Sequence, residues 1–148
     1  MEHVTVKDLV LGSGGVLVSG SEEAPVSHIR LDSRQVEPGD LFVPLLGERV
    51  DSHRFLPQVM DQGAAAVLTS QELTLPEGGA GCAVIRVEDT KKALQKIGSY
   101  LRDRLTLPLV GVTGSVGKTT TREMIAAALS ARFRVYKTPG NSNSQVGV

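Results

Sequence analysis

The segment from Gly111 to Thr120, with the sequence GVTGSVGKTT, constrains the fold of this chain more than any other feature. The apolar run 109–113 in front of it predicts a short strand, and the residues from Lys118 to about Ala131 predict a helix. Between them, Gly114 and Gly117 allow a tight turn. Such a turn directs backbone N–H groups and the positive end of a helix toward one point. The pattern therefore predicts a phosphate-binding loop in an α/β fold with a parallel sheet.

This loop departs from the common form at one position, since Val112 stands where a glycine is usual, five residues before Gly117. The amino group of Lys118 is placed to reach the β- and γ-phosphates of a nucleotide, and the hydroxyl of Thr119 to ligate Mg²⁺. We expect these two residues to be catalytic. The alternative is a plain glycine-rich turn with an exposed lysine, but the flanking strand, helix and paired threonines favour the phosphate loop. The residues expected to bind nucleotide are Gly114, Ser115, Val116, Gly117, Lys118, Thr119 and Thr120.

Charge and composition exclude several classes of partner. Sixteen basic and sixteen acidic side chains balance, so no net positive field attracts nucleic acid or an anionic membrane. Aromatic residues make up only 3% of the chain, which leaves few platforms for stacking bases. The single cysteine, Cys82, excludes an internal disulfide and lies in an apolar run, so we expect a buried, inert thiol. Neither a signal peptide nor a membrane-spanning run is visible, so a cytoplasmic protein is expected.

Apolar runs alternate with helical patterns over the first part of the chain, which predicts a small α/β domain over residues 1–88. One helix is expected to open with a capping box at Thr5–Asp8 and to stop at Gly12. A second is expected over about 53–62. Candidate strands lie at 26–31, 41–46, 64–68 and 82–87.

A second domain is predicted over residues 89–148. It would contain an amphipathic helix capped by Glu88-Asp89-Thr90, the strand and helix that flank the phosphate loop, and a strand at 134–137. These few elements cannot cover both faces of a parallel sheet. We therefore expect the beginning of a P-loop ATPase domain, apparently truncated.

Polar turns follow two of the predicted strands. Asp32-Ser33-Arg34 is explained either as a side-chain-to-backbone turn with a surface salt bridge, or as a binding turn for an anion such as a diphosphate. In the turn 48–53, His53 is expected to cap or pack at a helix start rather than act as a base, because no second histidine or paired carboxylate suggests such chemistry. The polar segment 138–145 is either a solvated loop or part of the phosphate site.

Together these motifs resemble the Mur ligase family. The matches are Leu31-Asp32-Ser33-Arg34, Pro38-Gly39-Asp40-Leu41-Phe42, Gly47 with Asp51 and His53, Gly63-Ala64, and Thr113-Gly114-x-x-Gly117-Lys118-Thr119-Thr120. They run in the family's order through nearly the whole chain. Two positions depart from the family pattern: Ser52 stands where glycine is frequent, and Ser144 where a second asparagine is frequent.

The resemblance implies an enzyme that uses ATP and Mg²⁺ to convert the carboxylate of a UDP-linked peptide into an acyl phosphate, which an amine then attacks. The pattern at 137–143 is most similar to family members that join D-alanyl-D-alanine to UDP-N-acetylmuramoyl-tripeptide. The resemblance therefore implies these two small molecules as partners, and it implies a monomer. The first domain would hold the uridine nucleotide. The implied substrate-binding residues are Leu31, Ser33, Arg34, Glu48, Arg49, Val50, Asn141 and Asn143.

Three other functions stay open at this point. The chain could belong to the related ligase that adds the third amino acid to the UDP-muramoyl dipeptide. It could be a non-catalytic nucleotide-binding module, if the natural chain stops at Val148. A P-loop kinase is disfavoured by the α/β domain and the Asp32-Ser33-Arg34 turn that precede the phosphate loop.

Overall fold

The computed structural model describes residues 4–47, 51–72 and 81–138 of the 148-residue chain. The chain forms two compact units, Met1–Arg104 and Leu105–Val148. Each unit is described by itself below. No helix among the described residues is long and apolar enough to cross a bilayer.

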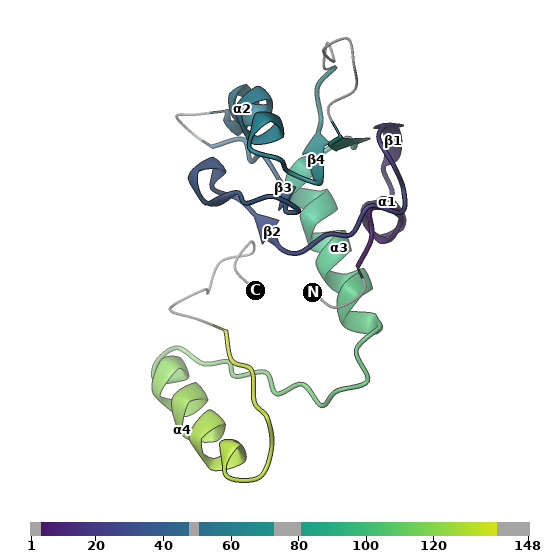
Figure 1. The fold of residues 1–148 in the computed structure, drawn as a ribbon. Coiled ribbons are helices and arrows are strands. Elements are labelled where there is room, and N and C mark those ends of the chain that lie inside the picture. Colours follow the sequence, from purple (N-terminus) through teal and green to yellow (C-terminus); the bar gives the residue numbers. More distant parts are fainter. Residues whose placement is uncertain (1–3, 48–50, 73–80, 139–148) are drawn as a thin grey trace. The chain divides into compact units, whose positions relative to one another are not determined.

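The first unit is built on a five-stranded sheet (Figure 1). The strands are β1 (Val16–Ser19), β2 (Ile29–Arg30), β3 (Leu41–Phe42), β4 (Ala66–Thr69) and β5 (Ala83–Arg86). Their order across the sheet is β1-β5-β4-β3-β2. Strands β2 to β5 are parallel, and β1 pairs antiparallel with β5 at one edge. This mixed sheet confirms the predicted α/β class.

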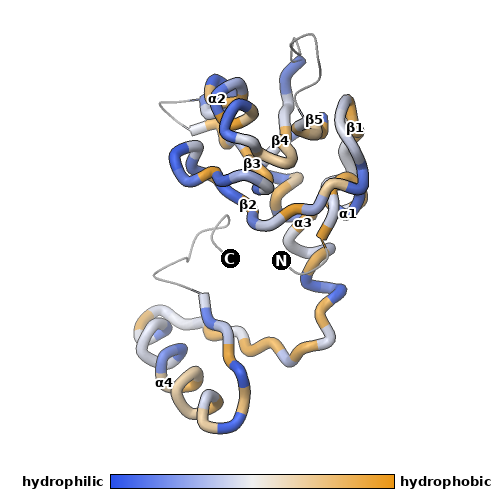
Figure 2. The backbone as a smooth tube through the Cα atoms, viewed as in Figure 1, coloured by the Kyte–Doolittle hydropathy of each residue, from blue (hydrophilic) through white to orange (hydrophobic). Residues whose placement is uncertain are grey.

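Both faces of the central strands are buried, because successive side chains of a strand point to opposite faces. In β5, Ala83 and Ile85 join one apolar cluster and Val84 joins the other. The first cluster lies under α1 (Val6–Ser13) and α3 (Thr90–Asp103), and the second under α2 (Leu56–Asp61). Figure 2 shows hydrophobic residues along these central strands. The continuous apolar runs in the sequence therefore correspond to strands covered on both sides.

Helix α1 begins with the expected capping box. The backbone N–H of Thr5 donates to Asp8 Oδ2 at 2.9 Å, which satisfies a donor left free at a helix start. The predicted stop at Gly12 is wrong, because the helix continues to Ser13 and ends at Gly14 with φ 68°. Gly12 instead lies against Tyr100 of α3, where an added Cβ would be 3.1 Å from the Tyr100 ring. A small residue is needed there so that the two helices can approach closely.

The strands near β2 are shorter than expected. The predicted strands at 26–31 and 41–46 are reduced to two residues each in β2 and β3. The predicted helix over 53–62 begins as the 3₁₀ turn η2 (Ser52–Phe55), and only Leu56–Asp61 is α-helical. Pro57 occupies the first turn of that helix, where its missing N–H has no consequence.

Helix α3 belongs to the first unit. It packs on α1, and its N-terminus is capped by Asp89, whose side chain accepts from Lys92 N–H at 2.9 Å. The predicted domain boundary between residues 88 and 89 would place α3 in a different domain from α1, on which it packs. The compact units instead divide between Arg104 and Leu105.

The second unit contains one helix, α4 (Lys118–Ser130), among its described residues. The strands predicted at 109–113 and 134–137 do not form there: within residues 105–138, neither segment has a partner strand with which to share ladder hydrogen bonds. Of residues 105–138, only Ala126 is buried. Met124, an apolar residue of this helix, is 67% exposed. Helix α4 thus agrees with the prediction, while its apolar face lacks a cover in the described part of this unit.

Candidate functional site

The carboxyl ends of β2 to β5 lie along one edge of the sheet, because these four strands are parallel. Ligands of α/β folds bind at this edge, where the loops that leave the strands meet. The Asp32-Ser33-Arg34 turn leaves β2 there, Ser70 leaves β4, and the 87–89 segment leaves β5. Two cavities open along the same edge.

The first cavity, which we call the β2 pocket, has a volume of about 500 Å³. One wall comes from the turn after β2 and the other from η2 and α2. Its lining residues are Leu31, Asp32, Ser33, Arg34, Ser52, Phe55 and Gln58. The structure therefore brings together three of the sequence-predicted substrate residues, Leu31, Ser33 and Arg34.

Within the β2 pocket, Asp32 holds Arg34. The Asp32 carboxylate accepts from the backbone N–H of Arg34 at 3.0 Å, from its Nε at 2.9 Å and from its Nη2 at 2.6 Å. These side-chain and backbone hydrogen bonds lower the pKa of Asp32 to about 2. The turn and salt bridge of the structural interpretation are thus both present. The Arg34 side chain is nevertheless 84% exposed, which leaves the outer part of its guanidinium accessible to an anion.

His53 lies beside this pocket and is buried, as expected for a residue that packs at a helix start. Its Nδ1 is 2.6 Å from Asp51 Oδ1, so a carboxylate does accompany it, contrary to the sequence interpretation. Asp51 also caps η2 by accepting from the His53 backbone N–H at 3.0 Å. The two-residue spacing lets one carboxylate contact both the backbone and the ring of the same histidine.

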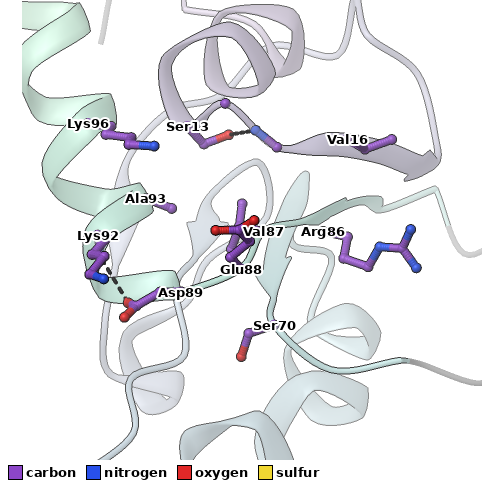
Figure 3. Close-up of a pocket in the computed structure, with 12 residues that line it drawn as sticks. Ser13, Val16, Ser70, Arg86, Val87, Glu88, Asp89, Lys92, Ala93 and Lys96 are labelled. Atoms are coloured by element: carbon purple, nitrogen blue, oxygen red, sulfur yellow. Dashed lines mark hydrogen bonds between the residues drawn. The ribbon is translucent and has the colours of Figure 1, made fainter.

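The second cavity, which we call the β5 pocket, has a volume of about 730 Å³ (Figure 3). Lys92 and Lys96 of α3 form one wall, and Ser70 and Arg86 lie on the other side. The sequence analysis identified none of its lining residues as a binding group. Their charges are mixed, since Glu88 and Asp89 stand among the basic side chains, so no run of like charge marked the cavity in the sequence.

A group of possible metal ligands, His28, Glu37 and Asp40, lies at the opposite edge of the sheet. Arg30 occupies this group, with its Nε 2.9 Å from Asp40 Oδ2. Burial, the largest influence, raises the pKa of Asp40, but hydrogen bonds from Arg30, the Glu37 backbone and His28 together lower it. The buried carboxylate is therefore paired with a guanidinium, and the cluster is an ion-pair network.

Cys82 is buried, as predicted, and burial raises the pKa of its thiol to about 11. The thiol is therefore protonated at neutral pH and is a poor nucleophile.

The phosphate loop lies in the second unit. Gly114 has φ 150° and Gly117 has φ 75°, backbone angles that residues other than glycine rarely adopt. Gly117 is the N-cap of α4, and the first helical hydrogen bond runs from Thr121 N–H to its carbonyl at 2.9 Å. Lys118 Nζ turns back over the loop and donates to the Gly114 carbonyl at 2.5 Å. The glycine turn, the helix start and the lysine thus lie together, as expected from the sequence, and phosphate binding by them stays a prediction.

The remaining loop residues Ser115, Val116, Thr119 and Thr120 are exposed. Five predicted substrate residues lie outside the described residues: Glu48, Arg49, Val50, Asn141 and Asn143.

Comparison with known families assigns both parts of the chain. Residues 25–102 match the description "Mur ligase family, catalytic domain", and residues 112–148 match "Mur ligase middle domain".

Curated relatives are similar over most of this chain. The UDP-N-acetylmuramoyl-tripeptide–D-alanyl-D-alanine ligase of Synechocystis is 47% identical over 129 residues, which cover 86% of this chain and 28% of the relative. The ligase of the same name from Bacillus subtilis is 41% identical over 145 residues, covering 97% and 31%. The UDP-N-acetylmuramoyl-L-alanyl-D-glutamate–2,6-diaminopimelate ligase of Cytophaga hutchinsonii is 42% identical over 118 residues, covering 78% and 24%.

Solved structures of related ligases are also similar to this chain. MurF from Acinetobacter baumannii superposes with a TM-score of 0.84 at 33% identity, over 97% of this chain and 31% of that one. MurF ligase from Thermotoga maritima, solved in complex with ADP, gives a TM-score of 0.69 at 33% identity, over 84% and 27%. The chain therefore spans about 30% of the length of the relatives that it matches.

Proposed function

The chain belongs to the Mur ligase family, and on that premise we propose that it serves the ATP-dependent joining of D-alanyl-D-alanine to UDP-N-acetylmuramoyl-tripeptide, a step of peptidoglycan precursor synthesis. The observation that carries the proposal is the glycine turn at Gly114 and Gly117 with Lys118 at the start of α4. It follows a separate α/β unit whose carboxyl edge holds the β2 pocket. The ligases from Synechocystis and Bacillus subtilis support this choice of substrates.

A second candidate is addition of the third amino acid to the UDP-muramoyl dipeptide. The 42% identity with the diaminopimelate ligase of Cytophaga hutchinsonii favours it. The two candidates share ATP and a UDP-linked muramoyl peptide, and they differ in the length of that peptide and in the amine. The amine that supports turnover therefore separates them.

The two units are proposed to divide the substrates between them. The first unit holds the UDP end of the peptide substrate, with Leu31 and Ser33 of the β2 pocket at the uridine and Arg34 at an anionic group. Ser33 is buried and Arg34 is exposed, which suits a polar contact deep in the pocket and a charged one at its mouth. The remaining proposed substrate residues are Glu48, Arg49, Val50, Asn141 and Asn143.

The second unit is proposed to hold ATP and Mg²⁺ through residues 114–120, and the residues present fit that task. Apart from its two chain neighbours, no atom of the described residues lies within 4 Å of a Cβ built at Gly117, so the described part of the loop leaves space on that side. Lys118 now donates to a carbonyl of the loop, and a phosphate oxygen would be a stronger, charged acceptor for the same amino group. The Thr119 hydroxyl is proposed as the Mg²⁺ ligand.

Bound ATP would supply the phosphoryl group that turns the peptide carboxylate into an acyl phosphate. The chain's own contribution is electrostatic. Lys118 and the N–H groups at the start of α4 neutralise charge on the phosphates as it shifts during transfer. We further propose a cytoplasmic monomer with these small-molecule substrates, without nucleic acid or membrane insertion.

A chimera tests the proposal. Residues 1–148 replace the matching segment of the Bacillus subtilis ligase, and phosphate release is measured with UDP-N-acetylmuramoyl-tripeptide, ATP and either D-alanyl-D-alanine or single amino acids. We expect turnover that depends on ATP and on UDP-N-acetylmuramoyl-tripeptide, the two substrates that residues 1–148 are proposed to bind. A folded chimera that binds neither the UDP-linked peptide nor ATP would refute the proposal.

A further inference from the structure

Four polar residues form a hydrogen-bond network at the carboxyl end of β4, beside the β2 pocket. His53 Nδ1 is 2.6 Å from Asp51 Oδ1, and His53 Nε2 is 3.1 Å from Ser70 Oγ. Gln71 closes the network by donating from Nε2 to Asp51 Oδ2 at 2.8 Å. The His53 side chain is only 3% exposed. Both ring nitrogens and both Asp51 oxygens are therefore engaged.

The tautomer of His53 follows from one of these contacts. The backbone N–H of Ser70 lies 3.2 Å from His53 Nε2, and a backbone amide can only donate. Nε2 must therefore be the acceptor, which leaves the ring proton on Nδ1, where it donates to the Asp51 carboxylate. His53 is neutral in this arrangement, because a proton on Nε2 would face the Ser70 N–H.

The order Asp51, His53, Ser70 is that of a nucleophilic triad, but the network is not built for that chemistry. A triad histidine uses its free Nε2 lone pair to take the proton of the serine hydroxyl. Here the Ser70 backbone N–H already occupies that lone pair. The network therefore fixes position rather than activating Ser70.

What the network fixes is the η2 wall of the β2 pocket. His53 lies between Ser52 and Phe55, and both of these residues line the pocket. The Ser52 N–H donates to the Leu45 carbonyl at 3.2 Å, and Leu46 and Asp51 form an antiparallel bridge. The His53 ring, together with the Gln71 side chain on Asp51, thus ties η2 to the end of β4.

We propose that His53 is a positioning residue for the UDP-linked substrate: by joining Asp51 to the Ser70 backbone, it holds the Ser52 and Phe55 wall opposite Ser33 and Arg34. This inference rests on the proposed function, in which the β2 pocket receives the uridine nucleotide. Neither the Asp51 carboxylate nor the imidazole needs to touch the ligand. The effect of His53 is exerted through the shape of the pocket.

Two substitutions each remove one of the two contacts of the His53 ring and keep the other. In His53→Asn the amide nitrogen can replace Nδ1 as a donor to Asp51, but the contact with Ser70 is lost. In His53→Gln the longer side chain can place its oxygen near the Nε2 position and accept from the Ser70 N–H, but the Asp51 contact is lost. His28→Asn is the matched control, because His28 also contacts an aspartate but lies at the opposite edge of the sheet and is exposed.

The measurements are the dissociation constant of UDP-N-acetylmuramoyl-tripeptide by calorimetry and the melting temperature of each variant of this chain. We expect His53→Ala to weaken binding by about tenfold, or about 1.4 kcal/mol, because the Ser52 and Phe55 wall is no longer held opposite Ser33 and Arg34. His53→Asn and His53→Gln should each recover part of that loss, and His28→Asn should bind as the wild type does. In the wild type, ¹⁵N NMR of the His53 ring should show protonated Nδ1 and unprotonated Nε2.

Gln71→Ala covers the case in which His53→Ala does not fold, because the Gln71 side chain is exposed and can be removed without opening the core. It releases one Asp51 oxygen and should weaken binding about threefold at an unchanged melting temperature. Wild-type affinity in the folded His53 variants and in Gln71→Ala would overturn the inference while leaving the proposed function intact. If the wild-type chain itself did not bind the UDP-linked peptide, the proposed function of the first unit would fail instead.

Discussion

Arg34 and Asp32 form a bidentate ion pair within a three-residue turn, with Nε 2.9 Å from Oδ1 and Nη2 2.6 Å from Oδ2. The pair restricts the Arg34 side chain at the mouth of the β2 pocket, although that side chain is largely exposed. A guanidinium held in this way loses less rotamer freedom when it binds an anion.

Arg34→Ala should therefore weaken binding of the UDP-linked peptide by about 1.5–3 kcal/mol, the usual range for a hydrogen bond to a charged group. Calorimetry on the folded variant measures this loss. Arg102→Ala is the control, because Arg102 also pairs with a neighbouring aspartate but lies on α3 outside both pockets. Equal affinity of Arg34→Ala and the wild type would leave Arg34 with a structural role only.

The same pair predicts a pH dependence. The pKa of Asp32 is lowered from 3.8 to about 2 by its hydrogen bonds with Arg34, so the folded chain binds this proton less readily than the unfolded chain does. Stability from the pair should be present above about pH 4 and be lost as the pH falls toward 2. A carboxyl ¹³C titration should give a midpoint near 2 in the wild type and a higher one in Arg34→Ala. An unchanged midpoint in the variant would show that the Arg34 side chain is not the cause of the lowered pKa of Asp32.

Lys118→Ala in the active chimera should reduce turnover by about 10²–10³-fold, the typical loss of one electrostatic contact to a transition state. The exposed loop makes a large loss of stability unexpected. Thr119→Ala should also reduce turnover, but raised Mg²⁺ should partly restore it, whereas it should not restore Lys118→Ala. Affinity for the UDP-linked peptide should survive both changes. Near-normal turnover of folded Lys118→Ala would exclude a working phosphate loop.

Two helical glycines should respond in opposite directions to alanine. Apart from α3's own backbone and the two chain neighbours, no described atom lies within 4 Å of a Cβ added at Gly98, so Gly98→Ala should stabilise the chain by about 0.5–1 kcal/mol. A Cβ added at Gly12 in α1 would lie 3.1 Å from Tyr100 Cδ1 and 3.2 Å from Tyr100 Cβ. Because the Cβ of Tyr100 is fixed by the backbone of α3, it cannot move away without a shift of that helix. Gly12→Ala should therefore destabilise the chain by roughly 1–3 kcal/mol. Chemical denaturation measures both, and stabilisation by Gly12→Ala would contradict the close approach of α1 and α3.

Local signals in the sequence were sufficient for the α/β class, for the Thr5–Asp8 cap and for the turn before α4. Each depends on residues a few positions apart, whose geometry is set by the backbone. The role of Gly12 was not predictable, because it depends on Tyr100 from a distant helix. The absent strand at 109–113 has a similar cause. A strand needs a partner, and an apolar run does not say where that partner lies.

The candidate site divides in the same way. The Asp32–Arg34 pair lies within one turn and follows from the sequence. The contact of His53 with Ser70 joins residues seventeen positions apart and requires the fold. The β5 pocket was also invisible in the sequence, because its lysines belong to an amphipathic helix whose polar face is ordinarily solvated.

Asp40 stabilises the first unit at the amino ends of its parallel strands, while both pockets lie at the carboxyl ends. Its buried carboxylate receives Arg30 and His28, and its carbonyl accepts from Ala65 N–H at 2.9 Å, so one residue ties β2, β3 and β4 together at their amino ends. The loops at the carboxyl edge are then not required to hold these strands in register. Ser52 in the wall of the β2 pocket is at such a position, and a substitution there leaves the contacts of Asp40 in place. Substitutions along the carboxyl ends of the strands can therefore reshape the pockets while these contacts at the amino ends keep the strands in register.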